Sequence, residues 1–385
     1  MSIVRNICAD VKVVMQQYPI IAITGPRQSG KTTVLRDLLP DYRYVTLENP
    51  DVRAYAVQDG KGFFAEYDDK VILDEVQRVP AVFSYLQGIV DQNKVMGQYM
   101  LSGSQNFELM ENISQSLAGR VALYNLYPFD TQELVNTKHA PSDLGVWLST
   151  GGYPAIYDRG IKPSRYFADY MQTYIKRDIA RLVNVRDMAK FERFIRLCAT
   201  RAGQLVNYND LGRDAGISHT NVNNWLSLLE TSYVLYRLPP YHKNYSKRLI
   251  KSPKLYFYDT GLLAYLLGIK SDSLSPQHSH YGALFENMVV SEYIKQASHQ
   301  GIDRDYYFWR DSQGREVDLL YSEDQQLHIV EIKSTATIMP RLFKGLDFFQ
   351  KLAADEVATK TLVYGGDKDQ RRIHYRVKSW RSALV

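Results

Sequence analysis

The residues best suited to chemistry near the start of the chain form a glycine-rich loop. It reads GPRQSGKT and follows an apolar run, residues 20–23, that is typical of a buried strand. Such a loop wraps a triphosphate with its backbone, and the helix that follows presents its positive end to the phosphates. The pattern predicts ATP binding, with a glycine-rich turn that binds nothing as the alternative. The predicted nucleotide-binding residues are Gly25, Pro26, Arg27, Gln28, Ser29, Gly30, Lys31, Thr32 and Thr33.

Three residues complete a metal and water site around this loop. We expect Thr32 to place its hydroxyl on Mg²⁺, because this cation prefers oxygen ligands. The segment KVILDEVQ then carries Asp74 and Glu75 at the end of an apolar strand. Where the chain turns at the strand's carboxyl end, Asp74 can meet Mg²⁺ while Glu75 orients the attacking water. These residues predict ATP hydrolysis.

Two further polar residues lie next to later predicted strands, and each leaves two interpretations. Ser104, together with Ser102, ends the strand-like run that begins QYMLSG, and it is either a sensor of the γ-phosphate or the cap of a turn. Arg120 ends the string SLAGR and either stabilises charge on the transferring phosphate or forms an ordinary surface salt bridge. We include both among the candidate catalytic residues.

A second group of acids lies in the C-terminal third of the chain. A helical stretch carries Glu286, the strand EVDLLY carries Asp318, and a further strand carries Glu331 and Lys333 two residues apart. Residues two apart on a strand share one face. Glu286, Asp318 and Glu331 would hold Mg²⁺ or Mn²⁺, and Lys333 would orient or deprotonate water. This constellation predicts a PD-(D/E)xK nuclease-like fold, whose site is either active or retained in a scaffold.

In the middle of the chain, a basic segment comes after a sequence pattern typical of a helix-turn-helix motif. Helices are predicted near 208–215 and 219–233, with a turn at 216–218 between them. The next segment, YHKNYSKRLIKSPK, is rich in Lys and Arg and has no acid, as in a β-wing that neutralises phosphates. Subunit contacts made by a small helical domain are the alternative. The predicted DNA-binding residues are Lys243, Lys247, Arg248 and Lys251, with Lys254 in the same basic run.

The elements that must position these residues indicate an α/β protein of several parts. Strands expected near 20–24, 43–47, 70–74, 98–102 and 121–126 alternate with helices, which predicts a parallel sheet with helices on both faces. Gly151-Gly152-Tyr153-Pro154 breaks that pattern, and residues 165–202 are strongly helical. We expect a P-loop ATPase domain at 1–148, a helical connector at 149–202, a winged helix-turn-helix domain at 203–270 and an α/β restriction-endonuclease-like domain at 281–385.

The order of these parts resembles the AAA ATPases. It is most similar to a bacterial and archaeal family in which such a domain is fused to a C-terminal domain of unknown function. The resemblance covers nearly the whole chain and is carried by the strings GPRQSGKTT, ILDEVQ, LSGSQ, LAGR, LYPF, GGYPAIY, YIKRDI, YDTGLLAYLLG, FENMVVSEY, REVDLL and VEIKS. The resemblance implies a homo-oligomer whose ATP sites lie between subunits. Arg120 would then contribute either to the ATP site of its own subunit or to that of a neighbouring subunit.

Composition limits the remaining possibilities. The 385 residues include 47 basic and 42 acidic side chains, a net charge of +5, so contact with DNA must be local. No apolar run approaches a membrane span or secretory segment, and the two cysteines, Cys8 and Cys198, fit neither a disulfide framework nor a zinc site. We therefore expect a cytoplasmic ATPase that couples its nucleotide state to a DNA-binding, DNA-cleaving C-terminal region. An ATP-controlled switch with an inactive nuclease-like domain and a remodeller of protein partners are the alternatives.

Overall fold

The computed structural model describes residues 3–104, 116–179, 187–241, 251–270, 272–382 and 384. The chain divides into two compact units. The first contains Met1–Pro128 with the short segments Thr231–Tyr233 and Ser298–Ile302, and the second contains Phe129–Glu230, Val234–Ala297 and Asp303–Val385. These two units are a coarser division than the four domains predicted from the sequence, whose boundaries stay a prediction.

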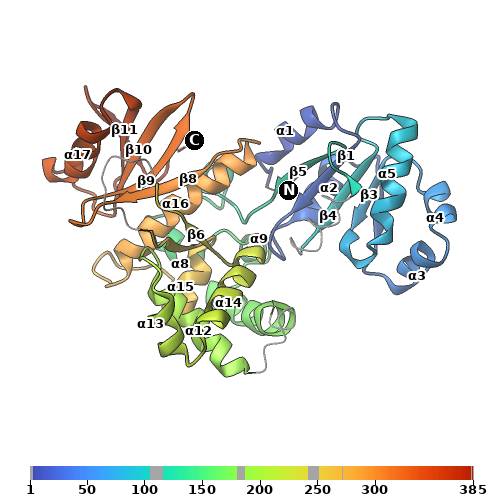
Figure 1. Cartoon of the computed structure of the whole chain (residues 1–385), viewed down its shortest axis with the longest axis horizontal. Coiled ribbons are helices and arrows are strands. Elements are labelled where there is room, and N and C mark those ends of the chain that lie inside the picture. Colours follow the sequence, from blue (N-terminus) through green and yellow to red (C-terminus); the bar gives the residue numbers. More distant parts are fainter. Residues whose placement is uncertain are drawn as a thin grey trace. The chain divides into compact units, whose positions relative to one another are not determined.

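The first unit is built around a parallel sheet whose strand order is β2-β3-β4-β1-β5 (Figure 1). The predicted strands are confirmed to within two residues, as β1 Ile20–Thr24, β2 Arg43–Thr46, β3 Val71–Asp74, β4 Tyr99–Gly103 and β5 Val121–Asn125. β1, β3 and β4 are buried along their whole length, as expected for central strands covered on both faces. Because all five strands are parallel, the carboxyl ends of β1, β3 and β4 meet at one edge.

Helices cover both faces of this sheet, and alternate strand residues enter two separate cores. Ala22 of β1 packs with one core, while its neighbours Ile21 and Ile23 pack with the other. The first core also takes residues of α3, α4 and α5, and the second takes residues of α1 and α2. These helices are α1 Ile7–Val14, α2 Lys31–Leu38, α3 Pro50–Gln58, α4 Gly60–Glu66 and α5 Ala81–Asn93, with a 3-10 turn, η1, at Val76–Arg78.

The second unit begins with helices and a two-stranded antiparallel sheet of β6 and β7. The predicted helices near 208–215 and 219–233 are confirmed as α13 and α14, and the turn between them holds Gly216 at a φ of 71°. The helices are α7 Thr131–Val135, α8 Leu144–Thr150, α9 Pro154–Arg159, α10 Pro163–Tyr170, the π-helix η2 Met171–Ile179, α12 Met188–Thr200, α13 Tyr208–Ala215, α14 His219–Thr231 and α15 Thr260–Leu266. The strands are β6 Leu235–Leu238 and β7 Lys254–Phe257.

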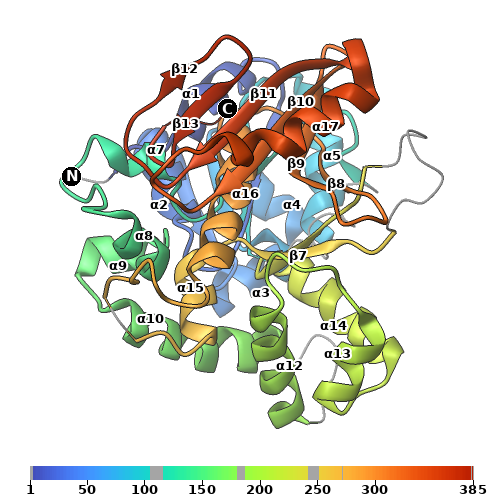
Figure 2. The same ribbon diagram turned by 90° about the vertical axis from the view of Figure 1, so that its left-hand side faces the viewer.

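The C-terminal part of the second unit is a six-stranded sheet of order β12-β13-β11-β10-β9-β8. β8, β9 and β10 are antiparallel neighbours, and α17 then leads to β11, which lies parallel to β10. Trp309 of β8 packs on Phe349 of α17, and Tyr321 of β9 packs on Tyr293 of α16. Figures 1 and 2 label these strands and helices. The elements are α16 Tyr281–His299, β8 Tyr306–Arg310, β9 Glu316–Glu323, β10 Gln326–Lys333, η3 Pro340–Phe343, α17 Lys344–Ala353, η4 Ala354–Glu356, β11 Val357–Tyr364, β12 Gln370–Arg371 and β13 Arg376–Ser379.

Hydropathy along the described helices bears on membrane insertion. Within the described part of the chain, no helix has both the length and the apolar character needed to cross a bilayer.

Candidate functional site

The phosphate loop joins β1 to α2 and depends on glycine at two positions. Gly25 has a φ of 143°, and a Cβ there would stand 2.3 Å from the carbonyl oxygen of Leu126. Gly30 has a φ of 95° immediately before α2 begins at Lys31. Residues other than glycine rarely adopt these φ angles, so the shape of the loop depends on these two glycines.

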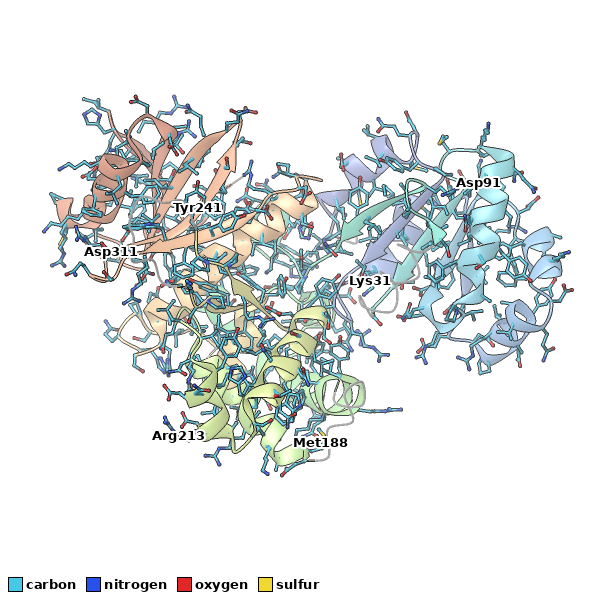
Figure 3. The ribbon with its side chains drawn as sticks, in the orientation of Figure 1. Lys31, Asp91, Met188, Arg213, Tyr241 and Asp311 are labelled. Carbon is cyan, nitrogen blue, oxygen red and sulfur yellow. The ribbon has the colours of Figure 1, made fainter. Side chains whose placement is uncertain are left out.

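Lys31 is the charged group of the loop and lies only 7% exposed at the first position of α2 (Figure 3). Its Nζ donates hydrogen bonds to the carbonyl oxygens of Gly25 at 2.9 Å and Pro26 at 2.8 Å. Burial lowers the pKa of this ammonium to about 8, although the charges of Glu75 and Asp74 oppose the shift. The lysine is thus a desolvated cation whose direct partners are uncharged oxygens.

Asp74 is the point at which hydroxyl groups from three elements converge. Thr32 Oγ1 donates to Asp74 Oδ2 at 3.0 Å, and the hydroxyl of Tyr44 in β2 donates to the same oxygen at 2.6 Å. Ser102 Oγ, near the end of β4, donates to Asp74 Oδ1. The structure therefore brings Thr32 and Asp74 together, as the sequence predicts.

Tyr44 was not among the predicted site residues, and Ser102 was predicted only as the polar neighbour of Ser104 at the end of the same strand. Tyr44 lies on the strand beside β3, two residues before its carboxyl end, and Ser102 is the parallel-sheet partner of Asp74. The sequence does offer one indication of both residues: each is a polar side chain near the carboxyl end of a strand that neighbours β3, which ends in Asp74. Ser102 was visible in the same run as Ser104, but its contact with Asp74 depends on the register of β3 and β4.

Glu75 follows Asp74 in a left-handed conformation, with a φ of 54°. A positive φ is uncommon for any residue other than glycine, and it turns the chain, with the Glu75 carboxylate, away from the line of the strand. Gln77 Nε2 donates to Glu75 Oε2 at 2.5 Å, and Ser104 Oγ donates to the same oxygen at 3.3 Å. Ser104 therefore contacts the predicted water-orienting acid.

Arg120 is not brought to this edge of the sheet. It immediately precedes β5, so it stands at the amino end of the strands, opposite the phosphate loop. Its Nε and one Nη donate to both oxygens of Asp91 in α5, at 2.6 and 2.8 Å. Asp91 and Lys31 lie well apart in Figure 3. Within a single chain Arg120 forms the surface salt bridge that was the alternative prediction.

The loop and the Asp74 cluster fit ATP and Mg²⁺. Ser29 Oγ is buried in the loop and has no hydrogen-bond partner, so it is an orphaned polar atom that a ligand would satisfy. Thr32 and Asp74 supply the hydroxyl and carboxylate oxygens that Mg²⁺ takes as ligands. The backbone of the loop and Lys31 supply the donors and the positive charge that a triphosphate requires.

The predicted C-terminal acids also come together. Lys333 Nζ lies 2.6 Å from Glu331 Oε1 and 3.1 Å from Asp318 Oδ2. Asp318 Oδ2 also accepts from the backbone N–H of Ile332 at 2.7 Å. Burial and the nearby charge of Asp318 raise the pKa of Glu331 to about 8, whereas both carboxylates outweigh burial and raise the pKa of Lys333. Glu331 Oε2 is buried with no hydrogen-bond partner.

Among the described residues of this region, one carboxylate group fits a metal by distance. Oxygens of Glu286, Glu316 and Asp318 lie within 4.8 Å of one another. The sequence picked out Glu286 and Asp318 but not Glu316, whose position at the start of β9 gave no separate signal. Glu331 is not a member of this group and instead pairs with Lys333.

Lys254 corrects the prediction of an exposed basic wing. It is the first residue of β7, and its side chain is only 3% exposed. Its Nζ lies 2.9 Å from Glu286 Oε1 and also pairs with Glu316. Burial alone would lower its pKa, but Glu286, Asp318 and Glu316 together raise it. Lys254 is therefore a buried counter-ion of the acids rather than a surface base.

The other predicted wing residues are only partly described. Lys251 is exposed, while Lys243, Lys247 and Arg248 lie outside the described residues.

The carboxylate group of Glu286, Glu316 and Asp318 has a built-in cation. As arranged here these acids do not fit a divalent metal ion, because the Lys254 ammonium already contacts two of the three carboxylates.

Comparison with known proteins agrees with the geometry of the first unit. The family described as "AAA domain" matches residues 17–135, and "Domain of unknown function (DUF4143)" matches residues 281–382. A further "Domain of unknown function (DUF8612)" matches residues 141–273. "Uncharacterized protein Mb2031c" of Mycobacterium bovis and "Uncharacterized protein Rv2008c" of Mycobacterium tuberculosis are each 30% identical over 366 residues, covering 94% of this chain and 80% of their own.

The chain belongs to the same family as these two mycobacterial proteins. This chain pairs an AAA-type P-loop ATPase domain with a C-terminal DUF4143 domain, so this part of the predicted resemblance is confirmed. The solved structure of "the walker-type ATPase PABY2304 of Pyrococcus abyssi" is also similar, with a TM-score of 0.45 and 13% identity over 68% of this chain and 94% of that one. A similarity of that size carries no functional conclusion.

Proposed function

We propose that this protein hydrolyses ATP at the phosphate loop and uses its nucleotide state to control a C-terminal module that acts on DNA. One observation carries the first half of this proposal. The hydroxyls of Thr32, Tyr44 and Ser102 converge on Asp74, next to Glu75 and at the sheet edge where Lys31 begins α2. A carboxylate held by three donors beside a desolvated lysine is suited to a charged ligand.

The chain's own residues divide the work of hydrolysis. Bound Mg²⁺ would neutralise charge on the phosphates, held by Thr32 and Asp74. Lys31 would exchange its two carbonyl acceptors for phosphate oxygens and stabilise the charge that develops on the transferring group. Glu75, fixed by Gln77 and Ser104, would orient the attacking water. Arg120 would act only on a neighbouring subunit's site, in a homo-oligomer.

The DNA output rests on the arrangement of the C-terminal part. A helix, three antiparallel strands, a second helix and a strand parallel to the third follow one another as α16, β8, β9, β10, α17 and β11. Asp318, Glu331 and Lys333 lie on neighbouring strands of that sheet. This order supports the nuclease-like fold that the sequence predicts. The raised pKa of Lys333 keeps it charged, so it would orient an anionic group rather than take a proton.

A specific contact favours a second candidate, an ATP-controlled module that binds DNA without cutting it. Lys254 places a buried ammonium between Glu286 and Glu316. Arg310 also lies 3.3 Å from Glu316, so each of the two glutamates has a cation partner, which weakens the attraction of the site for a divalent cation. Cleavage would require Lys254 to leave its two carboxylates.

The test combines an ATPase assay with a DNA assay on the same preparations. Wild type, Lys31→Ala, Lys333→Ala and Lys254→Met are incubated with linear, circular and single-stranded DNA, with Mg²⁺ or Mn²⁺, and with or without ATP. We expect hydrolysis in all variants except Lys31→Ala, and DNA binding that changes with nucleotide. Lys61→Ala, an exposed lysine of α4, is the matched control.

The outcomes separate the candidates. Cutting by wild type that disappears in Lys333→Ala supports a nuclease, whereas cutting only by Lys254→Met supports acids that are blocked by their internal cation. DNA binding without cutting in every variant supports the switch. No DNA binding at low salt in any nucleotide state would remove the DNA output and leave a remodeller of protein partners.

A further inference from the structure

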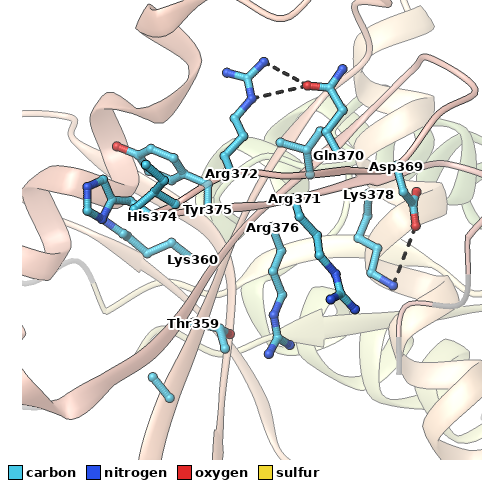
Figure 4. Close-up of a pocket in the computed structure, with 13 residues that line it drawn as sticks. Thr359, Lys360, Asp369, Gln370, Arg371, Arg372, His374, Tyr375, Arg376 and Lys378 are labelled. Carbon is cyan, nitrogen blue, oxygen red and sulfur yellow. Dashed lines mark hydrogen bonds and ion pairs between the residues drawn. The ribbon is translucent and has the colours of Figure 1, made fainter.

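A basic hollow lies on the sheet of the C-terminal domain, away from both sites described above. It has a volume of about 750 Å³ and is lined by β11, the β12–β13 ribbon and the turn that joins these two strands (Figure 4). Its basic lining residues are Lys360, Arg371, Arg372, His374, Arg376 and Lys378, while Asp369 is its one acidic lining residue. The charge of the hollow is therefore strongly positive in a protein whose net charge is only +5.

Two of these arginines face each other across the ribbon. Arg371 of β12 is the direct antiparallel partner of Arg376 of β13. Both side chains are exposed and extend in the same direction in Figure 4. Like charges directly opposite one another destabilise a strand pair. In the described part of the chain, neither guanidinium has a carboxylate partner to offset that repulsion.

The other cations of the hollow are balanced to different degrees. Lys360 pairs with Asp347 at 3.1 Å, and Lys378 lies 3.9 Å from Asp369. Arg372 donates to the neutral side-chain oxygen of Gln370, at 3.0 and 3.3 Å, and so keeps its charge. Arg372 also lies over the ring of Phe343, 5.4 Å from its centroid, and extends away from Arg371 and Arg376 in Figure 4. Arg371 and Arg376, here called the ribbon arginines, therefore form a pair that lacks built-in anions among the described residues.

The chemistry and shape of the ribbon favour one class of partner. Guanidinium groups match phosphate oxygens with two parallel hydrogen bonds. A two-stranded antiparallel ribbon is of a size that enters the major groove of a DNA duplex. At its tip Ile373 is 95% exposed between Arg372 and His374, which places an apolar contact among the cations. Bases and sugars present such surfaces beside the phosphates.

We propose that the β12–β13 ribbon binds the phosphate backbone of double-stranded DNA through the ribbon arginines. This inference rests on the proposed DNA output for the identity of the ligand, but not on cleavage. Arg376 of β13 pairs with Thr361 of β11, whereas Glu331 of β10 pairs with the next residue of β11, Leu362. Side chains of adjacent residues point to opposite faces. The ribbon therefore anchors a duplex on the face opposite the Glu331–Lys333 pair.

The experiment measures binding of a fluorescein-labelled DNA duplex to the full chain by anisotropy, over a range of salt concentrations. The test variant is Arg371→Gln with Arg376→Gln. The control variant, Arg341→Gln with Lys351→Gln, removes two exposed charges elsewhere in the same domain. We expect the test variant to bind about tenfold more weakly at 0.1 M salt and to lower the salt slope by about 2, with the control near wild type. Because the repulsion is removed, the test variant should melt at the same temperature as wild type or higher.

Each result points in one direction. Equal affinity and salt slope in the test and control variants, with wild type binding DNA, would overturn the ribbon assignment alone. Failure of wild type to bind DNA at low salt would overturn the proposed DNA output together with the ribbon. Binding of polyglutamate or of anionic lipid vesicles that depends on the ribbon arginines, without such dependence for DNA, would replace DNA by that partner.

Discussion

Two buried lysines, one in each compact unit, show how the same side chain serves opposite purposes. Lys31 is 7% exposed and donates to carbonyl oxygens, so burial dominates and lowers its pKa to about 8. Lys254 is 3% exposed and contacts Glu286 and Glu316, so its pKa is raised in spite of burial. The first lysine is a cation prepared for an external anion. The second already has its anions within the fold.

The largest effect on stability is expected when Lys254 is removed. Lys254→Met should lower the free energy of unfolding by about 3 kcal/mol, because two partly buried carboxylates lose this counter-ion while Arg310 still pairs with Glu316. Chemical denaturation with and without the substitution measures this difference. Lys251→Met, an exposed neighbour, should change stability by no more than about 0.5 kcal/mol. A loss under 1 kcal/mol for Lys254→Met would mean that the cluster is not an essential ion pair.

Removing Lys31 should affect activity instead of stability. Lys31→Met is expected to reduce ATP hydrolysis by about 100-fold or more, since it deletes a charge aimed at the transferring phosphate. Without nucleotide its stability should equal or exceed that of wild type, because the lysine is desolvated without a carboxylate in direct contact. Steady-state phosphate release measures the first effect and thermal unfolding the second. Activity within threefold of wild type would contradict the assignment.

The two lysines should also differ in their response to pH. In the free protein Lys31 loses its proton near pH 8, whereas a bound triphosphate favours the charged form and raises its pKa. Binding above pH 8 therefore requires uptake of a proton, and ATP affinity should fall roughly tenfold between pH 7.5 and 9. Titration calorimetry at both values tests this. Lys31→Arg, which stays charged, should lose this dependence; an identical fall in that variant would assign it to another group.

The smallest expected effect concerns the hydroxyl of Tyr44. Tyr44→Phe removes one of the three donors to Asp74, which should cost about 1 kcal/mol of transition-state stabilisation and about fivefold in ATP hydrolysis. Tyr42→Phe removes a hydroxyl that binds only the carbonyl oxygen of Gly97, so its hydrolysis should match wild type. If both variants hydrolyse ATP at the same rate, Tyr44 has no part in positioning Asp74.

Sequence reasoning reached the ATP site because its determinants are local. A glycine loop, an apolar strand and an acidic pair each leave a pattern within about ten residues, and parallel strands then bring them to one edge. Tyr44 was missed because its contact with Asp74 depends on the register between β2 and β3. That register is a property of the folded sheet.

Lys254 was misplaced for the same reason. A run of basic residues without an acid predicts a solvated surface, and Lys251, which is exposed, agrees with that prediction. The burial of Lys254 depends on acids of α16 and β9, which only the tertiary fold brings to β7. The ribbon arginines were likewise invisible, since the opposition of Arg371 and Arg376 follows from a hairpin register.

The most direct test of the central claim is the effect of Mg²⁺ and ATP on thermal unfolding in wild type, Lys31→Met and Lys254→Met. At about 100 times the dissociation constant, ATP should stabilise a binding-competent protein by about 2.7 kcal/mol. We predict a rise in melting temperature for wild type, the same rise from a lower baseline for Lys254→Met, and none for Lys31→Met. An equal rise in Lys31→Met would contradict the conclusion that this lysine is held ready for the phosphates.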